Sequence, residues 1–263
     1  MKLDKNEKRK LIMKNYAAVA VSQGSNGCCG SGCSCSGATV DARDAARILG
    51  YSEDDLNAVP DAANMGLGCG NPLAIAALKP GETVLDLGSG GGFDCFLARR
   101  QVGPEGLVIG VDMTPDMVML ARQNAQKAGY TNVSFRLGEI EHLPVADNTV
   151  DVIISNCVIN LALEKEKVFQ DAWRVLKSGG RLSISDVVAT AELPERIKND
   201  LAMLSGCIAG AEYVDNLRVM LEDAGFIDIR LVPKDNSREI LRTWVPDNMA
   251  EDYVASYLIE AIK

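Results

Sequence analysis

The chain has 263 residues, 47% of them hydrophobic and 24% charged, with a formal net charge of -9. This length and composition are those of a globular protein that buries a sizeable core. The negative balance argues against a nucleic-acid partner, which would need clustered Lys and Arg.

Membrane attachment and export are not expected either. No uninterrupted apolar stretch reaches the roughly 18 residues of a membrane span. The basic start of the chain, residues 2–14, is interleaved with acidic residues, and the apolar stretch after it is too short for an export signal. We therefore expect an amphipathic helix at the start of a cytoplasmic protein, with no membrane partner.

Eight cysteines are many for a chain of this kind. A secreted disulfide scaffold would be shorter and would carry an export signal, so a reducing compartment in which thiols bind or react fits better. Four of the cysteines fall in a Gly/Ser-rich loop over residues 24–37, namely Cys28, Cys29, Cys33 and Cys35. These cysteines could form either a zinc site or a mobile thiol segment. A zinc site generally needs a second spaced pair of Cys or His ligands, which the sequence does not offer. We expect the thiol segment.

Short helices are expected over 41–49 and 53–58, within an N-terminal segment that we place at 1–65. A glycine-rich loop over 65–72 then surrounds Cys69 and leads into a helix over 73–78. Because glycines flank Cys69 on both sides, we expect this thiol to be accessible.

From Glu82 onward, strands and helices alternate. Strands are expected at 82–87, 107–112, 132–137, 149–155 and 180–187, and helices at 92–101, 115–128 and 163–176. Near-continuous apolar strands that alternate with helices predict an α/β fold with a doubly wound, mostly parallel sheet.

The stretch from Val84 to Asp94 is a buried strand, a glycine turn and a helix start. Such a turn lets the backbone approach a ligand and presents the N–H donors of a helix N-terminus. Asp112 ends the next strand, where related folds place an acid that accepts hydrogen bonds from ribose. No Lys follows the glycines, and Asp86 and Asp94 flank them. A pyrophosphate is therefore less favoured than a cationic donor such as S-adenosylmethionine.

The second half of the domain, which we place at 66–234, continues this pattern. Cys157 follows the fourth strand and should face the ligand, because ligands bind beyond the carboxyl ends of such strands. Cys95 lies inside the first helix of the alternating region, where a packing role is favoured. A helix over 193–210 carries Cys207 and is expected to form a lid at about 190–210. A helix over 215–224 and a strand over 227–232 follow, and the substrate-side region 235–263 is expected to end in helix.

Three motifs resemble those of the class I S-adenosylmethionine-dependent methyltransferases. These are Asp-x-Gly-Ser-Gly-x-Gly, then Gly-Val-Asp-Met-Thr-Pro-Asp-Met, and later Leu-Lys-x-Gly-Gly. The resemblance implies that the cofactor is S-adenosylmethionine. It also implies a set of cofactor contacts: Asp86, Gly88, Ser89, Gly90, Gly92, Asp112, Met113, Gly138, Glu139, Ile140 and Asn156.

The substrate is suggested by what the chain lacks. Oxygen and nitrogen methylation usually need a positioned base, and His142, the only histidine, stands alone in a turn, so we assign it no role. Cys69, Cys157 and Cys207 are instead expected to gather at the carboxyl edge of the sheet. Three thiolates at one point would bind a soft, thiophilic centre.

The peptides Leu-Gly-Cys-Gly-Asn-Pro, Ser-Asn-Cys-Val-Ile-Asn-Leu and Ser-Gly-Cys-Ile-Ala-Gly-Ala resemble cysteine motifs of the arsenite S-adenosylmethionine methyltransferases. The resemblance runs from about residue 65 to the C-terminus. It implies arsenic detoxification, with Cys157 and Cys207 binding trivalent arsenic presented as thiol adducts and Cys69 as a third, mobile thiol. The re-reducing cysteine has no unique counterpart among Cys28, Cys29, Cys33 and Cys35. Thioredoxin or a small thiol would be the reductant.

Two other functions stay open. One is a class I methyltransferase for an organic molecule such as a quinone, in which the cysteines are structural. The other is a thiol- or metal-binding protein on a methyltransferase fold. No structural metal is expected in either the first alternative or the arsenical interpretation.

Overall fold

The computed structural model describes residues 4–21, 41–244 and 250–263. The predictions for Cys28, Cys29, Cys33 and Cys35 therefore lie outside the described residues. The strands form one seven-stranded sheet in the order β3-β2-β1-β4-β5-β7-β6. Their bounds are Thr83–Leu87 (β1), Leu107–Asp112 (β2), Val133–Leu137 (β3), Val150–Asn156 (β4), Leu176–Ala189 (β5), Ile227–Pro233 (β6) and Val254–Ile262 (β7).

Strands β1 to β5 run parallel to one another, and β7 is antiparallel to both β5 and β6. The predicted fold class, a doubly wound and mostly parallel sheet, is confirmed. Each strand that was predicted lies within two residues of its expected start and end, except β5, which begins four residues early. The sheet order reverses direction between β1 and β4, where folds of this kind bind ligands.

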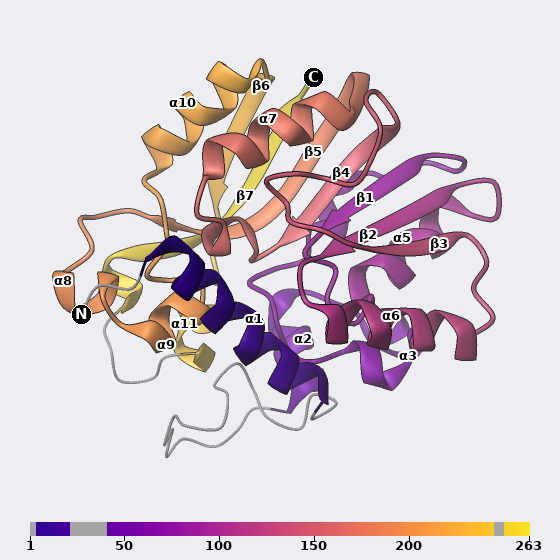
Figure 1. Ribbon diagram of the computed structural model, residues 1–263, viewed down its shortest axis with the longest axis horizontal. Coiled ribbons are helices and arrows are strands. Elements are labelled where there is room, and N and C mark those ends of the chain that lie inside the picture. Colours follow the sequence, from indigo (N-terminus) through magenta and orange to yellow (C-terminus); the bar gives the residue numbers. More distant parts are fainter. Residues whose placement is uncertain (1–3, 22–40, 245–249) are drawn as a thin grey trace.

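Helices cover both faces of the sheet (Figure 1). Helices α7 (Lys165–Val175) and α10 (Val214–Ala224) lie on one face, and α4 (Leu73–Ala76), α5 (Phe93–Val102) and α6 (Pro115–Lys127) on the other. Successive residues of β1 alternate between these layers, because side chains along a strand point to opposite faces. Leu85 packs in the core beneath α7, whereas Val84 packs in the core beneath α5.

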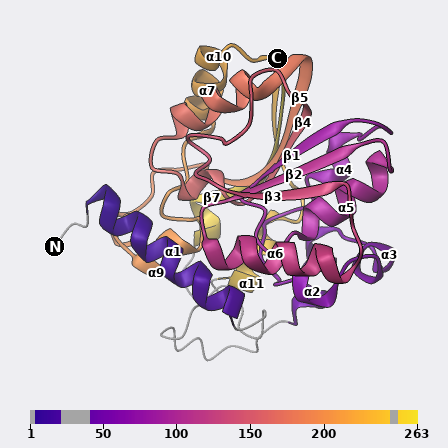
Figure 2. The ribbon, with the colours of Figure 1, turned by 45° about the vertical axis from the view of Figure 1, so that its right-hand side comes forward.

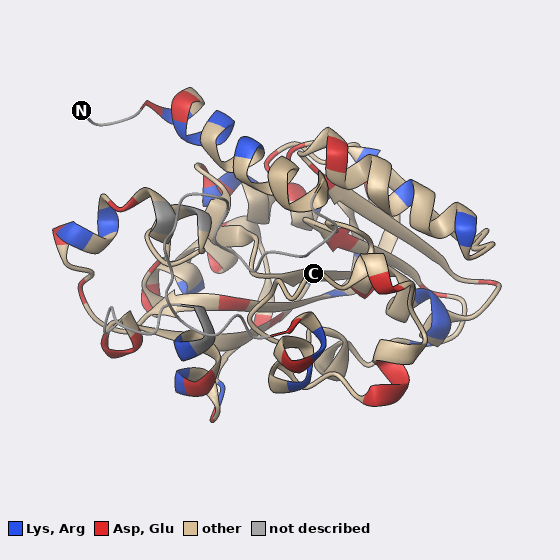
Figure 3. Cartoon of the chain, turned by 90° about the horizontal axis from the view of Figure 1, so that it is seen from below, with Lys and Arg blue, Asp and Glu red and all other residues tan. Residues whose placement is uncertain are grey.

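The N-terminal segment closes the carboxyl end of the sheet. Helix α1 (Lys5–Val21) lies along α6 (Figure 2). The short elements α2 (Ala42–Leu49), α3 (Glu53–Asn57) and η1 (Asp61–Ala63) follow it. Acidic and basic residues are interspersed over the helices seen in Figure 3. Within the described ranges, no helix is both long enough and apolar enough to cross a bilayer.

Two predicted helices are wrong. The C-terminal segment is strand β7, in which burial alternates over residues 254–257 and again over residues 258–262, as expected where side chains point to opposite faces of a sheet. The helix predicted over 193–210 is interrupted, leaving α8 (Glu195–Lys198) and α9 (Leu201–Ser205). The break occurs at Asn199 and Asp200, because the Asp200 carboxylate accepts a hydrogen bond from the N–H of Met203 at 3.1 Å and so starts a new helix.

The remaining elements connect these parts. They are η2 (Ile159–Leu161), α11 (Ser237–Trp244) and η3 (Ala250–Asp252). Helix α11 was not predicted. It packs against β7 and α2, and so joins the end of the chain to the N-terminal segment.

Candidate active site

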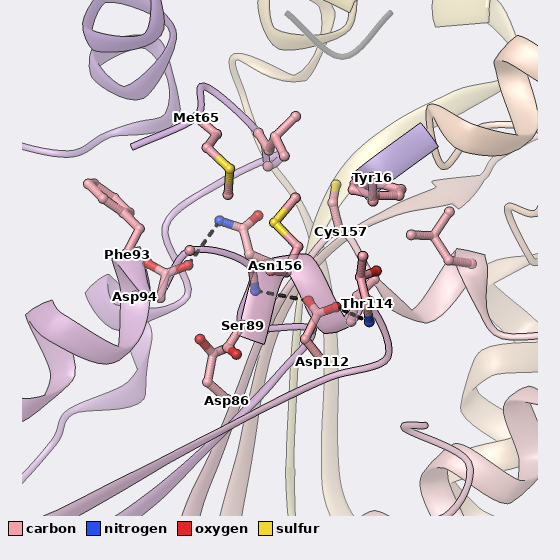
Figure 4. Close-up of a pocket in the computed structure, with 18 of the residues that line it drawn as sticks. Tyr16, Met65, Asp86, Ser89, Phe93, Asp94, Asp112, Thr114, Asn156 and Cys157 are labelled. Atoms are coloured by element: carbon pink, nitrogen blue, oxygen red, sulfur yellow. Dashed lines mark hydrogen bonds between the residues drawn. The ribbon is translucent and has the colours of Figure 1, made fainter. Parts of the chain in front are cut away.

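One cavity lies beyond the carboxyl ends of β1, β2 and β4 (Figure 4). Arg9 and Tyr16 of α1 line it together with the sheet, so segments far apart in sequence enclose it. The predicted site residues that line it are Asp86, Gly88, Ser89, Gly90, Asp112, Met113, Ile140, Asn156, Cys157 and Cys207. The structure thus brings the glycine turn and two of the cysteines to one cavity.

Asp112 holds the turn that forms this cavity. Its Oδ2 accepts a hydrogen bond from the N–H of Gly90 at 3.0 Å, and its Oδ1 accepts one from the N–H of Thr114 at 2.8 Å. Burial raises the pKa of Asp112, although these hydrogen bonds act against the shift. Each carboxylate oxygen can accept a further hydrogen bond, so the carboxylate can receive hydroxyl donors from a ligand in the cavity.

Two more carboxylates border the cavity at the start of α5. Burial raises the pKa of Asp94 to about 6 and holds the pKa of Asp86 well above its usual range. The hydroxyl of Tyr51 donates to Asp94 at 2.6 Å, and the thiol of Cys95 donates to Asp86 at 3.2 Å. Cys95 is buried, as a packing role requires. Acidic groups with raised pKa values favour a cationic ligand, which would stabilise their ionised forms.

Asn156 connects this part of the cavity to the loop that carries Cys69. Its side-chain NH2 donates to the carbonyl of Gly70 at 2.7 Å, to Tyr51 Oη at 3.1 Å and to Asp94 Oδ2 at 3.4 Å. Its Oδ1 accepts a hydrogen bond from the N–H of Cys69 at 2.9 Å. The thiol loop and the acidic wall of the cavity therefore share one hydrogen-bonded side chain.

The three predicted cysteines lie together. A disulfide joins Cys69 to Cys157, with their Cα atoms 5.7 Å apart. The thiol of Cys207 donates to the carbonyl of Cys157 at 2.8 Å. Cys157 and Cys207 have φ values of +56° and +63°. Such left-handed backbone is uncommon for residues other than glycine and is concentrated at functional sites.

Other expectations differ from the structure. Cys69 is fully buried rather than accessible, because the loop folds inward and its carbonyl accepts a hydrogen bond from Ser256 Oγ of β7 at 2.7 Å. Three predicted cofactor contacts lie outside the cavity lining: Gly92, Gly138 and Glu139. Gly92 faces the aromatic core, where an added Cβ would lie 2.7 Å from Phe96 Cζ. Glu139 forms an ion pair with Arg9 at 3.4 Å instead.

Several side chains around the site were not predicted from the sequence. Nothing in the spacing singled out Tyr51, Asn160 or Ser256. Asp186 could have been predicted, because ligands bind beyond the carboxyl ends of the strands and Asp186 lies near that end of β5. One of its carboxylate oxygens and the sulfurs of Cys69 and Cys157 lie within 4.8 Å of one another.

The donor set fits S-adenosylmethionine. Its ribose presents hydroxyl donors, for which Asp112 offers acceptor oxygens. Its amino group and sulfonium are positive, and Asp86 and Asp94 offer negative charge. The turn from Gly88 to Gly91 supplies backbone that a ligand can approach closely.

A methyltransferase domain model matches residues 78–225. Together with the seven-stranded fold and the acidic cavity, this match defines a class I S-adenosylmethionine-dependent methyltransferase. Such proteins share the fold even at low identity: phosphoethanolamine N-methyltransferase 2 from Haemonchus contortus, solved with S-adenosylmethionine, superimposes with a TM-score of 0.64 at 20% identity. The superposition covers 86% of this chain and 60% of the Haemonchus chain.

More similar proteins identify the family within this class. Arsenite methyltransferase from Halobacterium salinarum is 52% identical over 99% of this chain and 68% of its own length. The human arsenite methyltransferase is 41% identical over 63% of this chain and 46% of its own length. The crystal structure of an arsenic (III) S-adenosylmethionine methyltransferase from Chlamydomonas reinhardtii has a TM-score of 0.63 and 33% identity, with 84% of this chain and 73% of that chain covered. The chain belongs to the arsenite methyltransferase family.

The chain spans only part of the length of the arsenite methyltransferases it matches. It spans about two thirds of the Halobacterium protein and about half of the other arsenite methyltransferases it matches. A more distant match is a ubiquinone/menaquinone biosynthesis C-methyltransferase from Salmonella arizonae, which is 32% identical over 57% of this chain and 68% of its own length.

Proposed function

We propose that this enzyme transfers methyl groups from S-adenosylmethionine to trivalent arsenic bound by Cys157, Cys207 and Cys69. One observation carries the proposal. Three cysteines, separated by 88 and 50 residues, lie together, and two of them line the cavity that holds the acidic groups suited to the methyl donor. Cysteines with a purely structural role would not need to gather beside the cavity that holds the acidic groups.

The three carboxylates that line the cavity, Asp86, Asp94 and Asp112, bind and orient the methyl donor. We propose that Asp112 accepts hydrogen bonds from the ribose, while Asp86 and Asp94 face the positive groups of the donor. S-adenosylmethionine supplies an electrophilic methyl group when it is bound. Met113 and Ile140 line the same cavity and offer apolar surface for the adenine. The chain thereby holds the two reactants next to each other, a placement that can contribute several kcal/mol to the rate.

The thiols remove the need for a base. Trivalent arsenic held by thiolates keeps a lone pair and has no proton to lose, so the lone pair can attack the methyl group directly. The new bond joins arsenic to carbon, and the bond from carbon to the sulfonium sulfur breaks with its electron pair leaving on that sulfur. Arsenic is thereby oxidised from the trivalent to the pentavalent state. His142, which is exposed in the structure, is not required.

Two thiols can then return the two electrons to arsenic by forming a disulfide. The observed pairing of Cys69 with Cys157 supports this step, because it places an oxidisable pair at the site. A thioredoxin or a small thiol would reduce the disulfide by exchange, with Cys28, Cys29, Cys33 and Cys35 as candidate relays. Such reductants are abundant in the cytoplasm, where we propose that the enzyme serves arsenic detoxification. The segment around Cys207 would cover the bound substrate.

The proposal is tested by incubating the reduced protein with arsenite, S-adenosylmethionine and a thiol reductant, and separating the arsenic species by chromatography. We expect methylated arsenicals and one S-adenosylhomocysteine for each methyl group transferred. A matched reaction with a demethylated quinone in place of arsenite addresses the match to the quinone C-methyltransferase. Turnover of the quinone without methylated arsenic would replace the proposal with the organic-substrate alternative.

A further inference from the structure

Cys157 and Cys207 depend on their surroundings for their relative position. They come from segments 50 residues apart, and both have left-handed backbone, which is strained for a residue other than glycine. Such a conformation persists only where neighbouring groups fix it. The groups that fix these two cysteines are polar and buried, and they are not among the residues proposed to contact S-adenosylmethionine.

Asn160 is the side chain that joins the two cysteine segments. It lies three residues after Cys157, in η2, and is 3% exposed. Its NH2 group donates to the carbonyl of Cys207 at 3.0 Å and to the carbonyl of Val187 in β5 at 2.6 Å. The orientation of the peptide that follows Cys207 is therefore set by a residue of the Cys157 turn.

Asp186 in turn fixes Asn160. Its Oδ1 accepts a hydrogen bond from the NH2 of Asn160 at 3.1 Å, and its Oδ2 accepts one from the N–H of Ile159 at 2.8 Å. The backbone of Gly210 also approaches closely, because an added Cβ there would lie 2.2 Å from the carbonyl oxygen of Asn160. The turn after Cys157 and the turn after Cys207 are thus held against each other.

The distance between two sulfurs matters for arsenic because both must bond to one atom. Residues that orient metal ligands through hydrogen bonds commonly change metal affinity by about 10–100-fold when they are replaced. We propose that Asn160, oriented by Asp186, is a positioning residue that sets the separation of the Cys157 and Cys207 sulfurs and thereby the affinity for trivalent arsenicals. This inference rests on the proposed function, since it assumes that these two thiols share one arsenic atom.

The test uses phenylarsine oxide, which forms two arsenic–sulfur bonds with a thiol pair and releases water. The full chain carries Ser at positions 28, 29, 33, 35 and 69 and is kept reduced, so that Cys157 and Cys207 are the thiol pair addressed. Affinity for phenylarsine oxide is measured by competition with a soluble dithiol, and affinity for S-adenosylmethionine by calorimetry. We expect Asn160→Ala to weaken phenylarsine oxide binding by roughly tenfold or more and to leave S-adenosylmethionine binding within about twofold.

Asn124→Ala is the matched control. Asn124 is also buried, but its side chain donates to the carbonyl of Gly91 in the glycine turn at 3.1 Å. The opposite pattern is expected, with weaker S-adenosylmethionine binding and unchanged phenylarsine oxide binding. A general loss of stability would not produce this crossed result. If Asn160→Ala does not fold, Asp186→Asn replaces it, because it removes one hydrogen bond from the same turn and should also weaken phenylarsine oxide binding selectively.

The outcomes separate the two proposals. If the parent chain does not bind phenylarsine oxide, or binds it equally well after Cys207→Ser, the shared-thiol site itself is wrong and both proposals fail. If the parent binds and Cys207→Ser does not, the thiol pair stands. Unchanged phenylarsine oxide affinity in the folded Asn160 or Asp186 variant would then overturn the positioning role alone.

Discussion

Replacing either Cys157 or Cys207 with Ser is expected to abolish arsenic methylation while S-adenosylmethionine still binds. A serine hydroxyl is a hard, protonated group at neutral pH and cannot replace a thiolate as a ligand for a soft centre. With one of its sulfur ligands lost, the arsenic is no longer held in a fixed position beside the methyl donor, and the advantage of placement is lost. We expect the rate to fall by more than about 100-fold, measured by chromatography of methylated arsenic.

The residues proposed to contact S-adenosylmethionine provide the internal control. Asp112 and the glycine turn lie on another part of the cavity, so calorimetry should give a nearly unchanged dissociation constant for S-adenosylmethionine in both variants. Cys95→Ser controls for the loss of a buried thiol as such, and it should leave arsenite binding intact, because Cys95 contacts Asp86 rather than the thiol group. Full activity of either serine variant, on arsenite or on the thiol adduct of its monomethyl form, would rule out the assigned roles.

Asp112→Ala is expected to weaken S-adenosylmethionine binding by roughly 10- to 100-fold. Hydrogen bonds to a charged group contribute about 1.5–3 kcal/mol, and the proposed ribose contacts depend on this carboxylate. The substitution also releases the N–H groups of Gly90 and Thr114, which hold the turn in place. Titration calorimetry of the apo protein measures the effect directly.

Glu105→Ala is the companion variant for Asp112→Ala. Glu105 is exposed in the loop before β2, so its loss changes the net charge equally without altering the cavity. Its dissociation constant for S-adenosylmethionine should match that of the unmodified protein. The ribose assignment fails if Asp112→Ala binds as tightly as Glu105→Ala.

The central sheet could be predicted because its strands are short apolar runs bounded by turn residues. The run from Leu107 to Asp112, for example, is found as β2 with its predicted bounds. The glycine turn could be placed for the same reason, since the pattern of a strand, glycines and a helix start is local. The gathering of three cysteines was expected because the carboxyl ends of parallel strands meet at one edge of a sheet.

Features decided by distant contacts were not predictable. The peptide from Tyr257 to Ile262 contains good helix formers but is part of strand β7, which fills the position between β5 and β6. A signal was present, since Val254 and Ser256 are buried two residues apart, as are Ile259 and Ala261, which is the spacing of a strand on each side of one shift. Cys69 was expected to be accessible because of its glycine neighbours. Its N–H instead donates to Asn156 of β4, and its carbonyl accepts from Ser256 of β7, so its loop lies against the sheet.

Arsenic X-ray absorption spectroscopy tests most directly whether the sulfurs share one arsenic atom. The sample is the reduced protein with Ser at positions 28, 29, 33 and 35, loaded with one equivalent of arsenite. We expect a first shell of three sulfur atoms around arsenic, and one sulfur fewer on Cys207→Ser. A shell dominated by oxygen, or one that Cys157→Ser and Cys207→Ser both leave unchanged, would contradict it.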